Sequence, residues 1–373
     1  MGEINIDNTG SGAAVTLSSD GSSLLLGGSA IGGGGGGGAS ASADLYKANP
    51  SSATSPTAAG ANSIAIGNGA TVGSGGTNAI AMGLQANATA TASMGFGYDA
   101  EATAEYTTAF GAAWATASAS YASAFGMDAT ATASRALALG KARANGADSF
   151  AANIGSTSTS YGANVGKGIA IGYMAKCSAG NIALGRNAQA TGSGGVAISV
   201  GYSNVGPQAK TNAIAIGDKI ISTGNGQYAY GIANFAANGD GQGSTYILLA
   251  STTDATATSM TTTGGSPNYL NQVGSNWQVN DTCLTFSGTI VAMQNGCQAY
   301  GSWEVKGLLV NDGGTVSVPS SAITVIHNAS NWGITIGTDT TGGNNTLKIQ
   351  VTGEASHNIR WVANIQTSQV TFA

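Results

Sequence analysis

The chain has 373 residues, of which 59 are glycine, 8% are charged and 6% are aromatic. This composition departs from that of ordinary globular enzymes toward fibrous and repetitive proteins, and the hydrophobic fraction of 42% argues against disorder. The net charge of -5 includes no run of Lys or Arg, and no apolar stretch is long enough for a membrane helix, so we expect neither nucleic-acid binding nor membrane insertion.

Three short alternating segments lie near the N-terminus, at residues 4–10, 15–21 and 24–27. Turn residues separate them, which predicts short β-strands. The segments resemble the N-terminal parts of phage tail and virion structural proteins, and this resemblance implies that residues 1–31 attach the chain to phage tail or baseplate proteins. No basic region followed by an apolar core begins the chain, so we expect no secretory leader and assembly in a host cytoplasm.

Residues 32–59 are rich in Gly, Ser and Pro, and they include seven consecutive glycines at 32–38. Segments of this composition usually form linkers, because they have few side chains that could pack into a core. We therefore expect residues 32–59 to connect the attachment segment to the next domain.

A motif of the form large-small-large-Gly returns twelve times between residues 64 and 231. Its glycines follow one another at intervals of 13 to 17 residues, which indicates one structural turn per repeat. The residue before each glycine is large and apolar, and the residue before that one is small, with Asn153 as the exception. The large residues are Ile66, Met82, Phe96, Phe110, Phe125, Leu139, Ile154, Ile171, Leu184, Val200, Ile216 and Tyr230.

Two short strands per repeat account for this pattern. Because strand side chains alternate between two faces, large residues on one parity and Ala on the other predict a strand that packs tightly on its Ala side. The second half of each repeat alternates Ala with Thr, as at residues 86–90 and 129–133, which predicts a second strand. Intervening Gly and Thr argue against a helix. The sequence therefore predicts a parallel β-roll of about twelve coils over residues 60–243.

The small size of each coil predicts lateral association. A coil of about 14 residues encloses little volume, so an isolated stack would leave one apolar face in water. The hexapeptides NSIAIG at 62–67 and NAIAIG at 212–217 resemble the head repeats of the YadA-like trimeric autotransporter adhesins. This resemblance implies a left-handed roll in which three chains pack around a common axis as a homotrimer. The helical stalk and membrane anchor of that family have no counterpart here, which weakens the assignment to a bacterial surface autotransporter.

The repeat ends near residue 244, and four of the five tryptophans lie beyond it. Alternation at residues 347–351 and 359–365, with Gly and Asn clusters between such runs, predicts an antiparallel β-sandwich over 244–373. Three segments, at 286–292, 302–307 and 358–363, resemble a C-terminal domain of cyanophage tail-fibre and structural proteins. We expect this domain to be the receptor-binding one, with a host cell-surface glycan or protein as its partner.

Trp277, Tyr300 and Trp332 are the candidate receptor contacts, because aromatic rings can stack on sugars. A sandwich of this size also needs an aromatic core, and core packing is the simpler role for its tryptophans. Cys283 and Cys297 flank one apolar segment and could meet across a hairpin. The alternative is that the cysteines, Cys177 included, are small buried thiols.

Two further patterns are weak as signs of a ligand site. The Gly-Lys-Gly run at residues 166–168 lacks the Ser or Thr and the upstream Gly of a phosphate-binding loop, so it predicts a coil corner. His327 and His357 are the only histidines, and no Cys or carboxylate cluster completes a metal site around them. We therefore expect no metal-binding and no cofactor-binding residues, and no cofactor.

The densest carboxylates of the roll are Asp99, Glu101 and Glu105. Enzymes that cleave polysaccharides use carboxylate pairs, but these three are expected at coil edges, where solvated surface is the simpler role. We therefore expect no catalytic residues and no enzymatic activity.

The leading hypothesis is a structural, trimeric tail-fibre subunit of a phage, located in the virion, that links the particle to the host surface and mediates adsorption. A head fibre would have the same sequence features. A bacterial trimeric surface adhesin and a polysaccharide-degrading tailspike are the alternatives.

Overall fold

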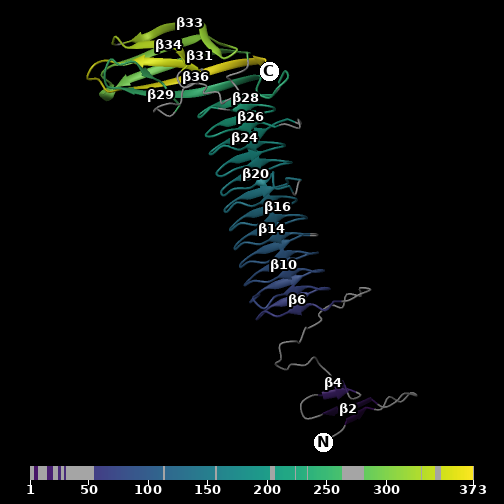
Figure 1. Ribbon diagram of the computed structural model, residues 1–373. Coiled ribbons are helices and arrows are strands. Elements are labelled where there is room, and N and C mark those ends of the chain that lie inside the picture. The colour runs from purple at the N-terminus through teal and green to yellow at the C-terminus, as the bar shows by residue number, and fades with distance from the viewer. Residues whose placement is uncertain are drawn as a thin grey trace.

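The computed structural model describes residues 54–111, 114–155, 158–201, 206–222, 224–232, 234–262, 281–328, 330–340 and 346–372, and the backbone of four short strands nearer the N-terminus (Figure 1). Within these residues the chain forms strands and turns, one 3-10 turn at Asn295–Cys297 (η1) and no α-helix. The predicted all-β class is therefore confirmed. No helix in this part of the chain is long and apolar enough to cross a membrane.

The N-terminal strands form an antiparallel sheet in the order β1-β2-β3-β4. They are β1 (Ile4–Ile6), β2 (Val15–Ser19), β3 (Leu24–Leu26) and β4 (Ser29–Ala30). The first three strands coincide with the alternating segments of the sequence, and Leu17 is the register partner of both Ile4 and Leu26. The predicted linker lies outside the described residues up to residue 53, and its last residues already belong to the first coil.

Twelve coils follow, and each contributes one strand to each of two parallel sheets. The longer strands form the first sheet: β6 (Ile64–Ile66), β8 (Ile80–Met82), β10 (Met94–Phe96), β12 (Thr108–Phe110), β14 (Ser123–Phe125), β16 (Leu137–Leu139), β18 (Phe150–Ala152), β20 (Ile169–Ile171), β22 (Ile182–Leu184), β24 (Val196–Ser199), β26 (Ile214–Gly217) and β28 (Tyr228–Gly231). The shorter strands form the second sheet: β5 (Thr57–Ala58), β7 (Thr71–Val72), β9 (Asn87–Ala88), β11 (Glu101–Ala102), β13 (Thr116–Ala117), β15 (Thr130–Ala131), β17 (Arg143–Ala144), β19 (Gly162–Ala163), β21 (Lys176–Cys177), β23 (Gln189–Ala190), β25 (Gln208–Ala209) and β27 (Ile221–Ser222). The predicted parallel solenoid of about twelve coils is confirmed.

Two coils differ in register from the sequence-based assignment. Ala151 and Ala197 are the residues that align with the central alanines of neighbouring strands, so Ile154 and Val200 lie beyond their strands. The sequence pattern was misleading there because each of these two residues happens to precede a glycine. Asn153 and Ser199 instead stand where other coils have the glycine, and Asn153 has a φ of 51°, which Asn tolerates better than most residues.

Small side chains, mostly Ala, fill the interior of the coils, and Val72, Ile154 and Ile220 are larger buried residues among them. The central residue of a first-sheet strand points inward and is Ala in every coil except the third, which has Gly95. Inward positions of the second sheet are also small, as at Ala131 and Cys177, and both are buried. Side chains of neighbouring coils stack in register, so the alanines form two buried columns, a short one over residues 70–88 and a long one over residues 100–229.

Glycine at the end of the first-sheet strands permits close stacking of coils. Gly172 has a φ of 118°, and a Cβ built on it would lie 2.8 Å from the backbone of Gly185 in the next coil. Gly126 is equally close to Gly140, at 2.8 Å. At these corners any side chain would have to displace backbone.

The C-terminal unit begins where the first sheet turns antiparallel. β29 (Gly241–Thr252) pairs with β28 on one side and with β36 (Ile359–Phe372) on the other. β36 also pairs with β31 (Asp281–Gln294). β31 pairs in turn with β32 (Tyr300–Asp312), and β32 with β33 (Thr315–Asn328). A smaller antiparallel sheet joins β30 (Thr258–Ser259), β35 (Thr346–Thr352) and β34 (Gly333–Asp339). Both sheets contribute to one buried cluster, in which Trp361 lies 5.5 Å from the ring centres of Trp303 and Trp332.

Replacing Ala138 by Leu should destabilise the solenoid by roughly 1–3 kcal/mol, because the coil interior has no space for a larger side chain. The matched control is Thr130→Leu, since Thr130 lies in the same coil and faces outward from the second sheet. Denaturant titration of both variants measures the effect. Equal midpoints for Ala138→Leu and the unaltered chain would contradict methyl-limited packing.

Two glycine substitutions compare a crowded coil corner with an open one. Gly180 has a φ of 67°, where an L-residue costs about 1–2 kcal/mol, whereas Gly172 has a φ of 118°, where a side chain is more strained. Only Gly172→Ala also meets backbone, because a Cβ on Gly180 has nothing within 4 Å. We expect Gly172→Ala to lower the melting temperature clearly more than Gly180→Ala, and a smaller loss at Gly172 would show that the coils can separate freely.

Candidate functional site

The first sheet presents an uncharged apolar stripe on its outward side. We call it the apolar ladder, and it consists of the first and third residues of the twelve first-sheet strands from β6 to β28. None of these positions carries a charged residue, and the only small or hydroxylated aliphatic residues among them are Thr108, Ser123 and Ala152. We call each of these residues a rung. Many rungs are open to solvent in the single chain, as at Phe110, which is 56% exposed.

Rungs of the apolar ladder stack on one another along the solenoid. The ring of Phe110 lies 5.9 Å from that of Phe96 and 6.5 Å from that of Phe125. In-register pairing of parallel strands produces this stacking, because each rung lies directly beside the same position of the next coil. The ladder is therefore a straight, continuous surface rather than a set of scattered apolar residues.

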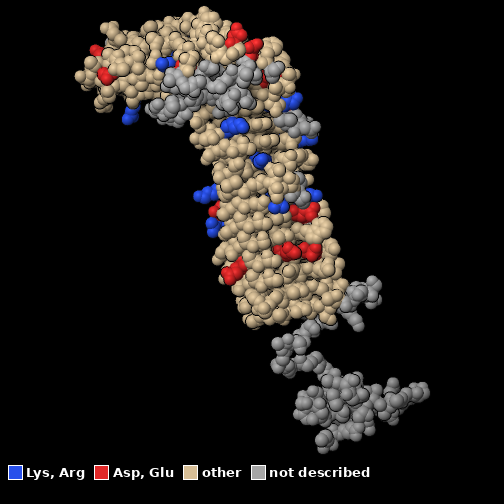
Figure 2. All heavy atoms as spheres, viewed as in Figure 1, with Lys and Arg blue, Asp and Glu red and all other residues tan. Residues whose placement is uncertain are grey.

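The outward side of the second sheet has the opposite chemistry. Its outward residues are polar in ten of the twelve strands, and Gly162 and Ile221 are the other two. Charged groups occur among them, such as Glu101 and Arg143, and Figure 2 shows charged atoms as small separate groups on a mostly uncharged solenoid. Each sheet has an outward side, but only that of the first sheet is apolar. The first sheet is therefore the one suited to be buried against another protein surface.

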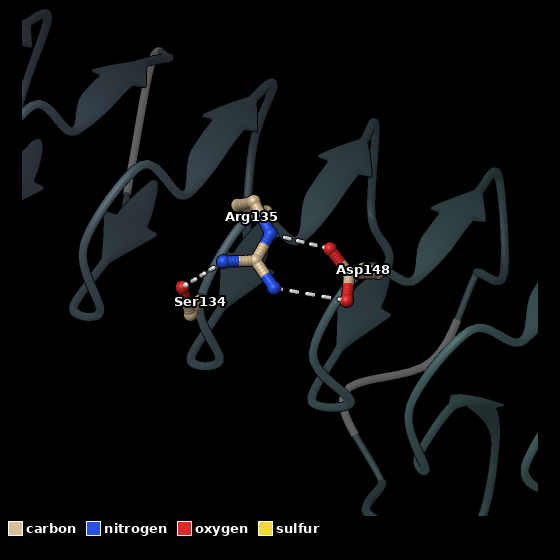
Figure 3. Close-up of polar contacts among 3 residues, drawn as sticks. All are labelled: Ser134, Arg135 and Asp148. Atoms are coloured by element: carbon tan, nitrogen blue, oxygen red, sulfur yellow. Dashed lines mark hydrogen bonds and ion pairs between the residues drawn. The ribbon is translucent and has the colours of Figure 1, made fainter.

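Charges at one coil corner pair between neighbouring coils (Figure 3). Arg135 and Asp148 occupy equivalent left-handed turn positions, and Arg135 donates from Nε and Nη2 to the two carboxylate oxygens at 2.5 and 3.0 Å. These hydrogen bonds lower the pKa of Asp148. Lys141 and Asp128 form a second pair at 3.2 Å. The pairing links coils and leaves no cluster of like charges at these positions.

The outer face of the five-stranded sheet continues the face of the apolar ladder. We define the outer face as the residues of β29, β36, β31, β32 and β33 that alternate with the buried ones. The continuity follows from the pairing of β28 with β29, in which Tyr228 and Tyr230 are opposite Thr245 and Gly243 while Ala229 is opposite buried Ser244.

Tyr300 lies on this outer face, and the structure presents its ring to solvent. Its side chain is 55% exposed, and the ring stacks on that of His327 with centres 5.0 Å apart. Trp332 is only 4% exposed and packs against Trp361, so it has the core role that a sandwich was expected to require. Trp277 lies outside the described residues. Of the three candidate contacts, the structure therefore offers Tyr300 as an accessible ring.

Sequence reasoning missed a polar groove beside Tyr300. The groove has a volume of about 400 Å³ and lies between the ends of β29 and β31 and the start of β36. Arg360 lines it, and no catalytic or metal-binding motif marks that residue in the sequence. The only sequence signal near it was the resemblance of residues 358–363 to a phage fibre domain.

The other candidate groups occupy separate places. Asp99 lies at a coil corner, Glu101 faces outward from β11, and Glu105 is exposed in the following turn. His357 pairs with Glu354 at 3.2 Å, whereas His327 stacks on Tyr300. Within the described residues no three His, Cys, Asp or Glu side chains come together as metal ligands. Lys167, in the Gly-Lys-Gly run, occupies a left-handed turn with a φ of 62°.

The three cysteines are free thiols. Cys177 is buried in the coil interior, and this burial raises its pKa to about 12, so it remains a protonated thiol at neutral pH. Cys283 and Cys297 are exposed and lie near opposite ends of β31, which rules out the hairpin disulfide in this structure and also the buried-thiol alternative for these two residues.

Comparison with known proteins gives little beyond this geometry. No protein-family model matches the sequence, and no curated protein matches it. Among solved structures, the crystal structure of the Acinetobacter baumannii phage AM24 tailspike protein is similar at 8% identity, with a TM-score of 0.20 over 83% of this chain and 50% of that chain. The chain thus spans about half the length of that protein, and at this TM-score the likeness does not support an argument about function.

Proposed function

We propose that the chain is a structural subunit of a trimeric fibre, in which three solenoids pack through their apolar ladders. The observation that carries the proposal is the absence of charge from every rung over twelve coils, next to a second sheet whose outward residues are mostly polar. A soluble single chain would gain nothing from a long apolar stripe, whereas burial of that stripe between copies would remove it from water.

The number three and the left-handed winding come from the resemblance to YadA-like head repeats. Closed cyclic symmetry fits a straight ladder, because each chain then offers the same stripe to a common axis and no stripe remains open. Self-association repeats the same contact at every coil, so the contacts add along the solenoid. We also propose to class the two C-terminal sheets as an antiparallel β-sandwich.

The proposed place of the fibre is the virion of a phage. Its N-terminal segment would bind tail or baseplate proteins, the solenoid would act as a rigid spacer, and the C-terminal unit would contact a glycan or protein of the host surface. The resemblance of both flanks to phage structural proteins supports this order. A bacterial trimeric adhesin is the second candidate, supported by the same repeats.

The fibre is proposed to lack enzymatic activity. The carboxylates Asp99, Glu101 and Glu105 support this, because Asp99 occupies a left-handed coil corner while Glu101 and Glu105 are exposed. Incubation of the purified chain with host polysaccharide tests the tailspike alternative, since release of reducing ends would show a cleaving enzyme.

A charge on the apolar ladder should destabilise the oligomer. In Leu139→Lys, three like charges would meet near the common axis, whereas Thr130→Lys would place its charge on the outward side of the second sheet. We expect light scattering to give three times the chain mass for the unaltered protein and for Thr130→Lys, and dissociation at lower denaturant concentration for Leu139→Lys. A folded monomer of the unaltered chain would overturn the proposed assembly.

The purified full-length chain should block adsorption of the phage that carries it. A chain without residues 241–373 should keep its solenoid and lose this competition, because the C-terminal unit is proposed to make the host contact. Counting free phage after incubation with cells measures both effects. Undiminished competition by the shortened chain would move recognition to the solenoid, and failure of the full-length chain would contradict the role in adsorption.

A further inference from the structure

The groove beside Tyr300 lies at the end of the five-stranded sheet that projects beyond the solenoid. β29 leaves its pairing with β28 at Thr245 and continues to Thr252, which lines the groove. At about 3.3 Å per residue, this overhang places the groove roughly 20 Å beyond the last paired residue of the solenoid. The groove is thus separate in space from the apolar ladder.

Among the described residues that line this groove, Arg360 is the charged one and none is a carboxylate. The side chain is exposed, and within the described residues it forms no ion pair. Two acidic residues nearby in the chain have partners of their own: Asp254 accepts the backbone N–H of Thr256 at 2.7 Å, and Glu354 pairs with His357 at 3.2 Å. The groove therefore offers one planar guanidinium group that can donate hydrogen bonds to two oxygens of an anion.

Neutral hydrogen-bonding groups surround Arg360. Gln294, Asn295 and Asn358 contribute side-chain amides, none of which has a hydrogen bond within the described part of the chain. Their backbone is nevertheless fixed, because the N–H of Asn295 donates to the carbonyl of Asn358 at 2.9 Å. Amides held by a fixed backbone, each with a donor and an acceptor, suit a ligand rich in hydroxyl groups.

An aromatic ring lies one strand beyond the groove lining, because Tyr300 is opposite Met293 but does not itself line the groove. Arg360 is the register partner of Met293, and Met293 is the partner of Tyr300, so the three side chains form one row of the outer face at strand spacing. The contact with His327 holds the Tyr300 ring, whose centre lies 5.0 Å from that of the imidazole. A fixed and exposed aromatic ring next to polar groups offers an apolar surface for the C–H face of a sugar ring.

We propose that this groove binds a carboxylate-bearing sugar unit of a surface polysaccharide, with the carboxylate on Arg360, the hydroxyls on the amides of Gln294, Asn295 and Asn358, and the apolar face of the ring against Tyr300. The volume of about 400 Å³ falls in the size range of small-ligand sites. The inference rests on the proposed role of the C-terminal unit in host contact and adds the class of ligand.

The test compares an acidic oligosaccharide with its neutral counterpart. Oligomers of galacturonate and of glucuronate, each as the acid and as the methyl ester, are titrated into the full-length protein, and binding is measured by calorimetry and saturation-transfer NMR. We expect at least one acid form to bind roughly tenfold or more tightly than its ester, because the ester lacks the charge-assisted hydrogen bonds. Equal binding of acid and ester, or no binding of any of them, would overturn the proposal.

Three variants assign the effect to residues. Arg360→Gln should remove the preference for the acid and leave binding of the ester unchanged, whereas Tyr300→Ala should weaken binding of both forms. Lys306→Gln is the matched control, because Lys306 is an exposed cation on the same outer face that does not line this groove. If Lys306→Gln reduces the preference as much as Arg360→Gln, the discrimination comes from the general charge of the sheet and the proposed site is wrong.

Adsorption assays separate this inference from the proposed function. If the full-length chain blocks adsorption and Arg360→Gln blocks it equally well, the C-terminal unit can still contact the host, but not through a carboxylate in this groove. If the full-length chain does not block adsorption while acidic oligosaccharides bind in the way described, the site stands and the role in adsorption fails.

Discussion

The interior of most coils has room for little more than a methyl group, and this limit determines where most larger side chains lie; Val72, Ile154 and Ile220 are buried exceptions. Two strands joined by tight corners enclose a column filled by Ala131, Ala138 and their counterparts in other coils. A larger inward residue would have to push the strands apart, against hydrogen bonds that connect each coil to both neighbours. Most large apolar side chains of the solenoid therefore point outward, where a single chain leaves many of them exposed.

This limit connects the local repeat to the proposed assembly. A globular domain can bury its Ile and Phe residues inside, as the C-terminal unit does between its two sheets. The solenoid has little such space, so its outward apolar residues can leave water only between chains. The change from one arrangement to the other occurs at a single strand pair, β28 and β29, where the sheet continues but a second layer begins to cover its inner face.

The sequence predicts most of the solenoid because the same constraint repeats in every coil. Prediction failed at Asn153 and Ser199, where the glycine that marks the register is replaced and a neighbouring glycine imitates the pattern. Alternation in the C-terminal strands indicates two faces but does not distinguish buried Trp332 from exposed Tyr300. The groove could not be predicted, because its residues come from three segments that are distant in sequence and adjacent only after the strands pair.

The direction of the hydrogen bonds between coils has a mechanical consequence. They run along the stack, so a pull between the two ends of the solenoid would load successive coil-to-coil contacts in series, and the weakest contact would yield first. One coil of about 14 residues that unravels would release a chain up to about 45 Å long, in place of a stacked spacing near 4.8 Å. We therefore expect such a filament to be stiff under small forces and to lengthen stepwise under large ones. A sudden force would then extend the filament instead of breaking it.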